Sequence, residues 1–531
     1  MSAPAAAPVT HPPLPAGRAL SYMAAATVIG LSQGLQQGFV STSLPQLAGD
    51  LGITTTSAAW LLAVYMIPRV ALPVLLIKIR TQFGLRRFAE IGVVVYALVA
   101  LAAIWASDFR SALVLQALAG AAAAPLSTLA FLYMLEPLSP QAKMVLGLPL
   151  AMVVLMTGPL LARVIGPSLI GDGGMAGVHM AGLALALISL MLVLALPLRP
   201  MPRQKVIEPL DFLSFALIGF GFGGLIIAFV MGPIYNWTDM AWIGLLLAAA
   251  VLSLTLAVTV ELNRRAPLLD IRWLASPAIL HLTGTLLLFR LILSEQSAGA
   301  PRMFQVLGMG PDQMIGLFSV ISLAGVMGAL ACIAWMRPQR VPVFHLAALL
   351  VIAAGAFLDA QVTPDWRPTQ MIASQALIGF AGMLFMPPAM MAGLISALSK
   401  GPHYILSFVI VFISTQSLGG VLGSGLFTTF TTRRQALHLQ DLAAQLTPTD
   451  PATVQAMAGR MAALAGTLPD AGARRAQAAA DLAQQAGLQA WVQAYGDAYA
   501  LTGWAALIAA AALVLHLLRD RMTAKMMEPD Q

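Results

Sequence analysis

Four ionisable residues lie inside long apolar stretches of this sequence: Arg69, Arg163, Arg290 and Glu295. Within a bilayer such residues face a water-filled cavity or one another, because an isolated charge in hydrocarbon is costly. Glu295 could form a salt bridge with one arginine, or it could carry protons. The arginines could find partners inside the protein, but three guanidinium groups exceed one acid. An anionic substrate would satisfy the remainder, since a guanidinium matches a carboxylate through two hydrogen bonds.

Glutamines form a second polar set, of which Gln36 and Gln116 fall at the depth of Arg163 and Glu295, in the outer third of the membrane, whereas Arg69 and Arg290 lie near the middle of their stretches. Gln33, Gln36 and Gln37 are spaced i, i+3, i+4, so they share one face of a helix. Gln116 falls in another apolar stretch at the depth of Gln36. These amides could hydrogen-bond between helices, worth about 0.6–2 kcal/mol, or they could line a substrate path. Gln36 and Gln116 could also form a neutral pair. The glutamines and the four charged residues are the candidate transport residues.

Fourteen apolar stretches must position these side chains. A spanning helix needs about 20 apolar residues, and the stretches are continuous, whereas barrel strands alternate over about 10 residues. Of 531 residues, 59% are hydrophobic and only 10% are charged, against about 25% charged in soluble domains. The predicted fold is an all-α polytopic membrane protein with fourteen transmembrane helices. The stretches lie near 19–41, 57–77, 89–107, 111–134, 144–169, 179–198, 211–232, 240–262, 278–300, 313–336, 343–360, 369–396, 404–429 and 499–519.

Basic residues gather in the loops on one side of these stretches. The side that holds residues 1–18 carries most of the Lys and Arg, and the short loops opposite hold only Arg110, Arg302 and Arg367. This asymmetry predicts a multi-pass inner-membrane protein with both termini cytoplasmic. The net charge of +7 is therefore interpreted as a topology signal, and no nucleic-acid surface is expected.

Several kinds of chemistry are not expected. The single cysteine, Cys332, excludes a disulfide framework or a cysteine metal site. The seven histidines are scattered, and no His, Cys and Asp cluster has metal or triad spacing. No Walker-type loop is present, so ATP is not the direct energy source. We expect neither an enzyme nor a bound cofactor or metal.

One long polar segment, residues 430–498, falls between the last two apolar stretches on the non-cytoplasmic side. Its Ala-, Leu- and Gln-rich composition predicts two helical stretches, with a break at Pro448 and Pro451 and a second helix over about 474–494. A loop of this length is usually functional or disordered. It could be a lid that packs on the membrane domain, or a docking surface for a periplasmic partner.

Four collinear stretches resemble the major facilitator superfamily, specifically the fourteen-span drug exporters of the EmrB/QacA type. They are Ser43 to Gly52, Gln82 to Arg87, Pro267 to Arg272, and Gln416 to Gly423. Parts of the 430–498 segment also resemble the periplasmic loop of the EmrB branch. The resemblance covers nearly the whole chain and implies two six-helix bundles with two helices inserted between them. The implied divisions are a cytoplasmic tail 1–18, a first bundle 19–198, inserted helices 199–277, a second bundle 278–519 that includes the loop 430–498, and a cytoplasmic tail 520–531.

The departures from this family concern proton coupling. The acidic residue usual in the first span is Gln36 here, and the arginine usual in the fourth span is Gln116. The antiporter signature of the fifth span begins with Gly158 and Pro159, but its Gly-Gly pair is replaced by Ala162 and Arg163. The charges that the family uses for proton coupling are thus missing from their usual places.

The resemblance implies a secondary active exporter of small amphipathic or anionic organic compounds, of the multidrug-efflux type. Its expected partners are the substrate, protons, the lipid bilayer, a periplasmic adaptor protein and an outer-membrane channel. The alternatives are a dedicated exporter of one metabolite and a transport-inactive membrane scaffold or sensor. An open cavity at the bundle interface would favour transport, and a cavity collapsed onto the arginines would favour the scaffold.

Overall fold

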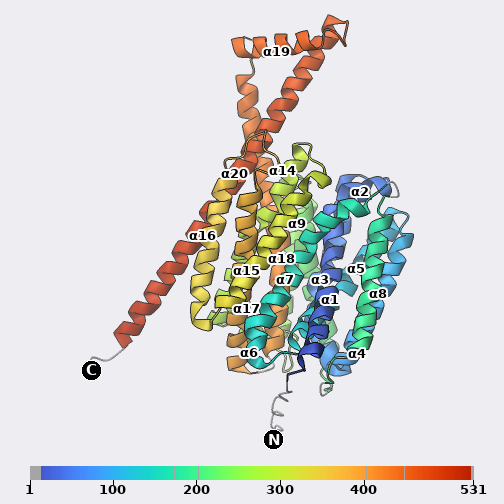
Figure 1. Ribbon diagram of the computed structural model, residues 1–531, viewed down its shortest axis with the longest axis vertical. Helices are drawn as coiled ribbons and strands as arrows, with labels where there is room; N and C mark the ends of the chain where they lie inside the picture. The colour runs from blue at the N-terminus through green and yellow to red at the C-terminus, as the bar shows by residue number, and fades with distance from the viewer. Residues whose placement is uncertain (1–12, 172–173, 201–202, 402–403, 448, 528–531) are drawn as a thin grey trace.

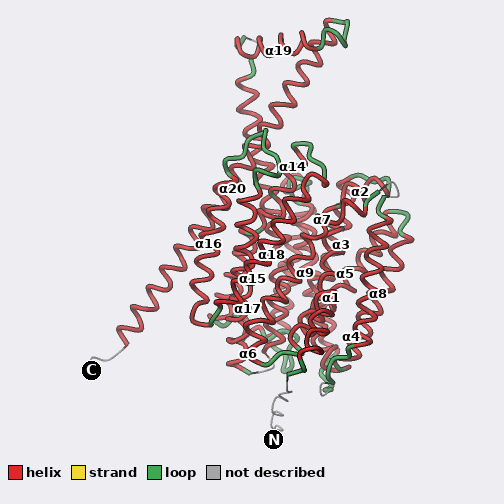
Figure 2. Tube along the Cα trace, in the orientation of Figure 1, coloured by secondary structure: helices red, strands yellow, loops and turns green. Residues whose placement is uncertain are grey.

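The computed structural model (Figure 1) describes residues 13–171, 174–200, 203–401, 404–447 and 449–527. Figure 2 shows that the regular structure of these residues is helical, and the single exception is an isolated bridge between Gly171 and Gly174. Most of the predicted N-terminal tail, residues 1–12, and the last part of the predicted C-terminal tail, residues 528–531, lie outside the described residues.

The helices follow one another with short connections. The first half of the chain forms α1 (Ala16–Thr42), α2 (Leu44–Asp50), α3 (Thr55–Phe83), α4 (Leu85–Ala102), α5 (Phe109–Leu135), α6 (Pro140–Ala142), α7 (Leu148–Leu169) and α8 (Ala176–Ala195). The middle forms α9 (Pro209–Met231), α10 (Ala241–Leu262) and α11 (Ile271–Leu274). The second half forms α12 (Pro277–Ile292), α13 (Ser294–Ala298), α14 (Ala300–Val306), α15 (Ile315–Trp335), α16 (Val341–Asp359), α17 (Ile372–Lys400), α18 (Tyr404–Gln445), α19 (Pro451–Ala463) and α20 (Ala471–Met527).

Local sequence explains where several helices begin and end. The side chain of Thr54 accepts a hydrogen bond from the backbone of Ser57 at the start of α3, and Asp108 forms a capping box with Ser111 at the start of α5. Such side-chain oxygens satisfy backbone N–H groups that the first helical turn leaves free. Gly84 ends α3 with φ of 89°, a conformation that favours glycine because other residues carry a Cβ.

Twelve helices among the described residues are long and apolar enough to cross a membrane. An all-helical membrane protein is therefore confirmed, whereas the count of fourteen spans stays a prediction. The two long helices outside the twelve are α1, with 27 residues, and α18, with 42, and both run through the bundle in Figure 1. In α1, the glutamines Gln33, Gln36 and Gln37 lower the apolar character. Gln33 is fully buried, so part of this polar face meets protein and not lipid.

The helices pack as two groups. In the first group α1 lies against α5 and α7, α3 against α5, and α4 against α8. In the second group α17 contacts α15 and α16, while α20 contacts α16 and α18. The groups meet where α7 contacts α15 and α17, and where α18 contacts α3, and α9 packs on α3 and α10. The division into two six-helix bundles and an inserted pair, with its boundaries, stays a prediction.

The contact between α1 and α7 depends on two glycines. A Cβ on Gly158 would lie 2.7 Å from the Cα of Gly34, and a Cβ on Gly34 would lie 2.9 Å from the Cα of Gly158. Real Cβ atoms do not approach backbone so closely, so only glycine at both positions allows this crossing, as small residues do in other membrane bundles. Gly158 is the residue whose resemblance to the antiporter signature was noted above.

The segment 430–498 forms a helical projection and not a lid on the bundle. Helix α18 continues past its membrane part to Gln445, α19 crosses over, and α20 returns as one helix of 57 residues into the last span. A break between helices is confirmed, because α18 ends at Gln445 and α19 begins at Pro451, while Pro448 itself lies outside the described residues. The second helical stretch is not separate from the last span. At the base, Asp497 of α20 accepts hydrogen bonds from Arg434 of α18 at 2.5 Å and lies 2.7 Å from His438.

A buried charge network ties the inserted helices to the first bundle. Arg264 contacts Asp211 of α9 at 2.6 Å and Glu261 of α10 at 2.9 Å, and Lys78 of α3 contacts Asp211 at 2.7 Å. The Arg264 side chain is 4% exposed, and both acids it contacts are fully buried. Removing one member of such a network leaves an uncompensated buried charge, which is more costly than never burying the network.

We predict that Arg264→Gln lowers the free energy of unfolding by about 3 kcal/mol, because Glu261 then loses its cation and Asp211 keeps only Lys78. Thermal unfolding of the purified protein in detergent measures the effect. The matched control is Arg265→Gln, since Arg265 is the next residue and is exposed. Equal melting temperatures for the two variants would show that the network does not hold α9 and α10.

Candidate functional site

The three glutamines of α1 face different surroundings. Gln33 is fully buried, its Oε1 accepts a hydrogen bond from Ser127 of α5 at 3.1 Å, and its Nε2 donates to the Gly30 carbonyl at 3.0 Å. Gln36 accepts from the Tyr96 hydroxyl of α4 at 3.0 Å. Gln37 is half-buried and makes no side-chain hydrogen bond with another described residue. Gln33 therefore joins α1 to α5, while Gln36 remains available to a cavity.

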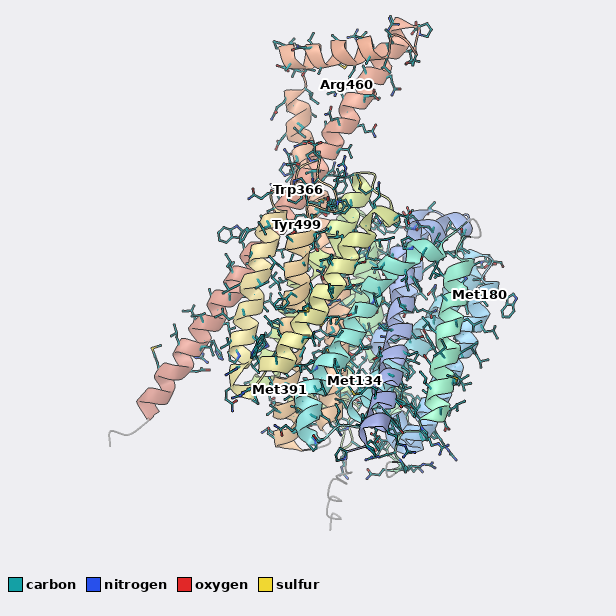
Figure 3. All side chains as sticks on the ribbon, viewed as in Figure 1. Met134, Met180, Trp366, Met391, Arg460 and Tyr499 are labelled. Atoms are coloured by element: carbon teal, nitrogen blue, oxygen red, sulfur yellow. The ribbon has the colours of Figure 1, made fainter. Side chains whose placement is uncertain are left out.

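That cavity has a volume of about 340 Å³ and lies between α1, α2, α4, α5 and α8. Gln36 and Gln116 both line it, together with apolar side chains such as Met180, which Figure 3 labels on α8. The two amides share the cavity without a hydrogen bond between them, so the expected neutral pair is not formed. Oε1 of Gln116 is buried and has no partner among the described residues, so it is an acceptor that a bound molecule or water could satisfy.

The three intramembrane arginines lie apart, each with its own contacts. Arg69 is buried and donates to the Tyr65 hydroxyl one helical turn earlier, at 3.2 Å. Arg290 donates from Nε to the Gln416 carbonyl of α18 at 3.2 Å. Neither arginine pairs with an acid among the described residues, so internal ion pairing does not explain their presence. Carbonyl and hydroxyl oxygens meet part of the hydrogen-bonding need of these two side chains.

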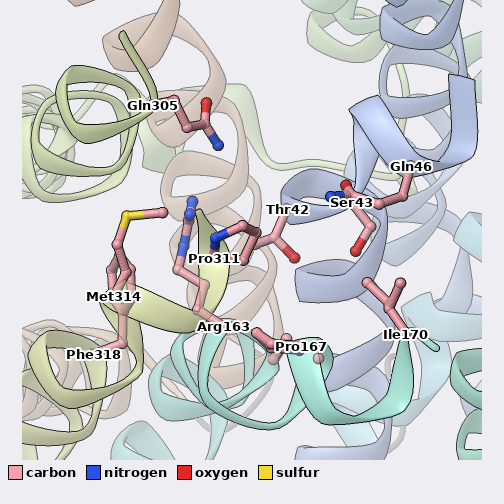
Figure 4. A pocket seen from close by; sticks show the side chains of 12 residues that line it. Thr42, Ser43, Gln46, Arg163, Pro167, Ile170, Gln305, Pro311, Met314 and Phe318 are labelled. Carbon is pink, nitrogen blue, oxygen red and sulfur yellow. The ribbon is translucent and has the colours of Figure 1, made fainter. Parts of the chain in front are cut away.

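Arg163 of α7 lies at the junction of the two bundles. Its guanidinium carbon is 4.9 Å from the ring centroid of Phe318 on α15, within the range of a cation–π contact. Figure 4 shows it beside Gln305, Thr42 and Ser43, which with other residues line a pocket of about 30 Å³. This space is too small to hold an organic molecule, so the junction does not admit a substrate at Arg163 in this conformation.

Glu295 does not form the salt bridge considered above. It is fully buried, and its Oε1 accepts a hydrogen bond from Nε2 of Gln375 at 2.6 Å, while Oε2 has no partner among the described residues. The same Nε2 donates to Oδ2 of Asp359 at 2.7 Å, and Ser374 donates to the other oxygen of Asp359. The second bundle thus contains two buried acids joined by one amide.

Asp359, Gln375 and Ser374 were not among the residues predicted from the sequence. Asp359 ends the apolar stretch near 343–360, and Gln375 and Ser374 begin the next stretch, near 369–396. A polar residue at the end of an apolar stretch normally faces water, so the positions of these three residues did not indicate a buried site. The signal that could have found them is the joint occurrence of Asp359, Ser374 and Gln375 across one short connection.

No metal site accompanies these acids: within the described residues, no group of three His, Cys, Asp or Glu side chains is close enough to hold an ion. The chemistry that the arrangement can perform is binding and proton exchange. The apolar walls of the larger cavity and the unpartnered Oε1 of Gln116 suit an organic molecule with one polar end, while Arg163 lines the separate, smaller pocket. The two buried acids, Glu295 and Asp359, are groups that can bind and release a proton.

In sequence, the chain is similar to several transporters, although no family model matches it. It is 23% identical over 504 residues to the uncharacterized MFS-type transporter YhcA of Bacillus subtilis, covering 92% of this chain and 90% of YhcA. It is 21% identical over 469 residues to the multidrug export protein EmrB of Haemophilus influenzae, and the match covers 83% of this chain and 86% of EmrB. The fatty acid resistance protein FarB of Neisseria gonorrhoeae is 24% identical over 270 residues, which cover 49% of this chain and 51% of FarB.

In fold, the chain is similar to major facilitator structures. The human organic anion transporter MFSD10 gives a TM-score of 0.56 at 11% identity, covering 93% of this chain and all 100% of MFSD10. The proton:xylose symporter XylE gives a TM-score of 0.55 at 13% identity, and the match covers 93% of this chain and 95% of XylE. The protein therefore has the major facilitator fold and homologues among major facilitator transporters. The predicted resemblance is confirmed, and the likeness to EmrB supports the drug-exporter branch at low identity.

We predict that a cysteine placed at Gln116 reacts with N-ethylmaleimide at least about tenfold faster than one at Ala123, because thiol reactivity requires access. Ala123 lies two turns further along the same face of α5 and is fully buried, so Ala123→Cys is the matched control. Both variants are made with Cys332→Ala to remove the native thiol. Equal rates would mean that the cavity is not reachable from solvent.

Proposed function

We propose that the protein is an inner-membrane secondary active exporter of small amphipathic or anionic organic compounds. The observation that carries this proposal is Arg163, a half-buried cation at the junction of the two bundles with no acidic partner among the described residues. An uncompensated arginine inside a membrane span is costly, about 2.5–3.5 kcal/mol on insertion scales when it lies at the centre of the span. A ligand carboxylate would offset that cost, since a guanidinium can donate two parallel hydrogen bonds to it.

The balance of buried charge supports an anion and not a cation as substrate. Glu295 and Asp359 are engaged with one amide, so they leave Arg69, Arg163 and Arg290 without a counter-charge. The relatives agree with an amphipathic substrate, since EmrB is a multidrug export protein and FarB a fatty acid resistance protein. A fatty acid is an apolar chain that ends in a carboxylate, which matches apolar walls beside a guanidinium.

Protons are the proposed energy source, in exchange for substrate. Export of a monovalent anion against entry of one proton moves two elementary charges in the same electrical direction. Each charge gains about 2.3 kcal/mol per 100 mV of membrane potential. An anion exporter of this kind therefore draws on the potential as well as on the pH difference.

The helical projection of α18, α19 and α20 is the proposed contact surface for a periplasmic adaptor protein and, through it, an outer-membrane channel. It stands away from the bundle (Figure 1), so a partner could reach both of its long helices. This proposal requires that the projection is periplasmic and both termini are cytoplasmic, as the distribution of basic residues indicates.

A transport-inactive membrane scaffold or sensor is the second candidate, favoured by the closed junction around Arg163. A dedicated exporter of one metabolite differs from the first proposal only in substrate range. Alternating access includes closed conformations, so a closed junction alone does not exclude transport. Any protein-dependent movement of substrate would exclude the scaffold.

Topology can be tested directly. We expect alkaline phosphatase, which is active only in the periplasm, to be active when fused after Gly487 and inactive when fused after Lys525. Green fluorescent protein at the same two positions is the control, because it fluoresces only in the cytoplasm. The reverse pattern would overturn both the orientation and the adaptor surface.

Substrate charge can be tested at Arg163. We expect Arg163→Gln to raise the apparent KM for cholate, an amphipathic carboxylate, by about tenfold or more, because a hydrogen bond to a charged group is worth about 1.5–3 kcal/mol. Arg163→Lys should fall between Gln and the native protein, since lysine keeps the charge but loses the bidentate geometry. Transport into inside-out membrane vesicles measures both.

The matched control is Arg367→Gln, because Arg367 is exposed and bonds only to carbonyl groups of its own loop. Export of lipophilic cations by the native protein, with no transport of cholate, would contradict the anionic assignment. So would Arg163 variants that fail to fold, since Arg163 would then be structural.

A further inference from the structure

Two buried carboxyl groups of the second bundle share a single hydrogen-bond donor. Nε2 of Gln375 lies 2.6 Å from Oε1 of Glu295 and 2.7 Å from Oδ2 of Asp359. Glu295, Asp359 and Gln375 are all fully buried. The three side chains come from α13, α16 and α17, so the amide links three separate helices.

No positive charge among the described residues reaches either carboxyl group. Arg302 on α14 is exposed and donates to Thr428, and Arg290 on α12 donates to Gln416. Helix α17 offers only neutral side chains at this point, including Ser374, which donates to Asp359. From α20 the pair is faced by tyrosines, of which Tyr499 lies where α20 meets the bundle (Figure 3). The charged and titratable groups on the elements that pack against the pair include Arg163, Arg290, Arg302, His345, Lys400, Arg433, Arg434, His438, Asp441, Tyr495, Asp497 and Tyr499.

Like charges this close in a buried site do not both ionise without a cation, so such a pair holds a shared proton and titrates as a unit. A neutral amide cannot replace the missing cation. Oε2 of Glu295 has no partner among the described residues, and is therefore the position at which a proton can be added without breaking a bond of the cluster.

Glu295 also lies on a broken helix. The chain from Pro277 to Val306 is interrupted at Leu293 and at Gly299, which leaves Glu295 on the five-residue helix α13. A Cβ at Gly299 would lie 2.5 Å from the Glu295 carbonyl oxygen and 2.7 Å from the Tyr499 ring. The break thus requires glycine. Discontinuous helices of this kind form ion sites in transporters, because their exposed helix ends and unwound backbone groups can bind a charged group.

We propose that Glu295 and Asp359, bridged by Gln375, form a shared proton site that couples export to proton entry. This inference rests on the proposed function as an exporter. A proton from one side of the membrane forms an O–H bond at Oε2 of Glu295, and the bond breaks when the proton is released to water on the other side. Two carboxylates cannot both stay ionised in the buried site, so release of the proton requires α13 to move away from α16, where water can reach the charges. Proton coupling then lies in the second bundle, which accounts for the uncharged Gln36 and Gln116 in the first.

The proton itself is tested by infrared difference spectroscopy of the purified full-length protein over a pH titration. We expect a protonated-carboxyl C=O band that disappears as pH rises, and that is lost or shifted in both Glu295→Gln and Asp359→Asn. Asp365→Asn is the matched control, because Asp365 is an exposed acid six positions after Asp359, and it should leave the band unchanged. Absence of a titrating buried-carboxyl band in the native protein would overturn the inference, even if the variants failed to fold.

Coupling is tested with radiolabelled cholate in membrane vesicles. We expect Glu295→Gln and Asp359→Asn to reduce gradient-driven accumulation at least tenfold and to retain cholate exchange at equal concentrations, which needs no proton. Asp359→Glu should restore part of the accumulation, whereas a purely structural pair would lose exchange together with accumulation. Gradient-driven accumulation that persists in both acid variants would overturn the inference.

The two failures are distinguishable. If the native protein neither accumulates nor exchanges cholate or any cation tested, the proposed function fails, and the infrared measurement alone still decides whether the pair holds a proton. If the native protein accumulates cholate but no carboxyl band responds to pH, the proposed function stands and the shared proton site is wrong.

Discussion

The cost of burying charge away from water constrains the buried polar features of this protein. Neither the bilayer nor a packed protein interior offers bulk water, so each buried charge needs a counter-charge, a hydrogen-bonding partner, a proton or a ligand. Arg264 takes the first solution, with Asp211 and Glu261 as its counter-charges. Among the described residues no cation reaches Glu295 or Asp359, and protonation is the solution that we propose for them. Arg163 has no acidic partner among the described residues, and a ligand anion is the counter-charge that we propose for it.

The salt-bridged network, the acid pair and Arg163 lie in three different parts of the fold. The salt-bridged network lies where the inserted helices join the first bundle, so it holds the structure together. The acid pair lies within the second bundle, on a helix that is broken at Gly299. Arg163 lies between the two bundles, against Phe318. A change of protonation in one bundle and a change of occupancy at the junction can therefore influence each other through the packing of α7 against α15 and α17.

Much of the fold could be predicted from hydropathy, because continuous apolar stretches leave few alternatives to membrane helices. The fourteen-span count is harder, since α1 carries Gln33 and Gln36 on a face that the bundle covers, and hydropathy cannot distinguish a protein-facing from a lipid-facing polar side chain. The continuity of α20 was also missed. Its Ala-rich polar part and its apolar span differ in composition, and this difference was interpreted as a boundary between two elements.

The site was less predictable because contacts between distant residues decide it. Glu295 was recognised as a buried acid, yet its partners Asp359 and Gln375 lie 64 and 80 positions away, and no local pattern joins them to it. The arginines were placed correctly in apolar stretches, but the sequence could not tell that they stay apart from one another and from Glu295.

The most direct test of the central claim follows the proton during transport. Proteoliposomes are loaded with cholate and a pH-sensitive dye, the membrane potential is clamped with potassium and valinomycin, and the vesicles are diluted into cholate-free buffer. Exchange of cholate for protons predicts protein-dependent acidification of the interior as cholate leaves, whereas passive loss of the neutral acid removes protons and makes the interior alkaline. Protein-dependent loss of cholate without acidification would contradict the account.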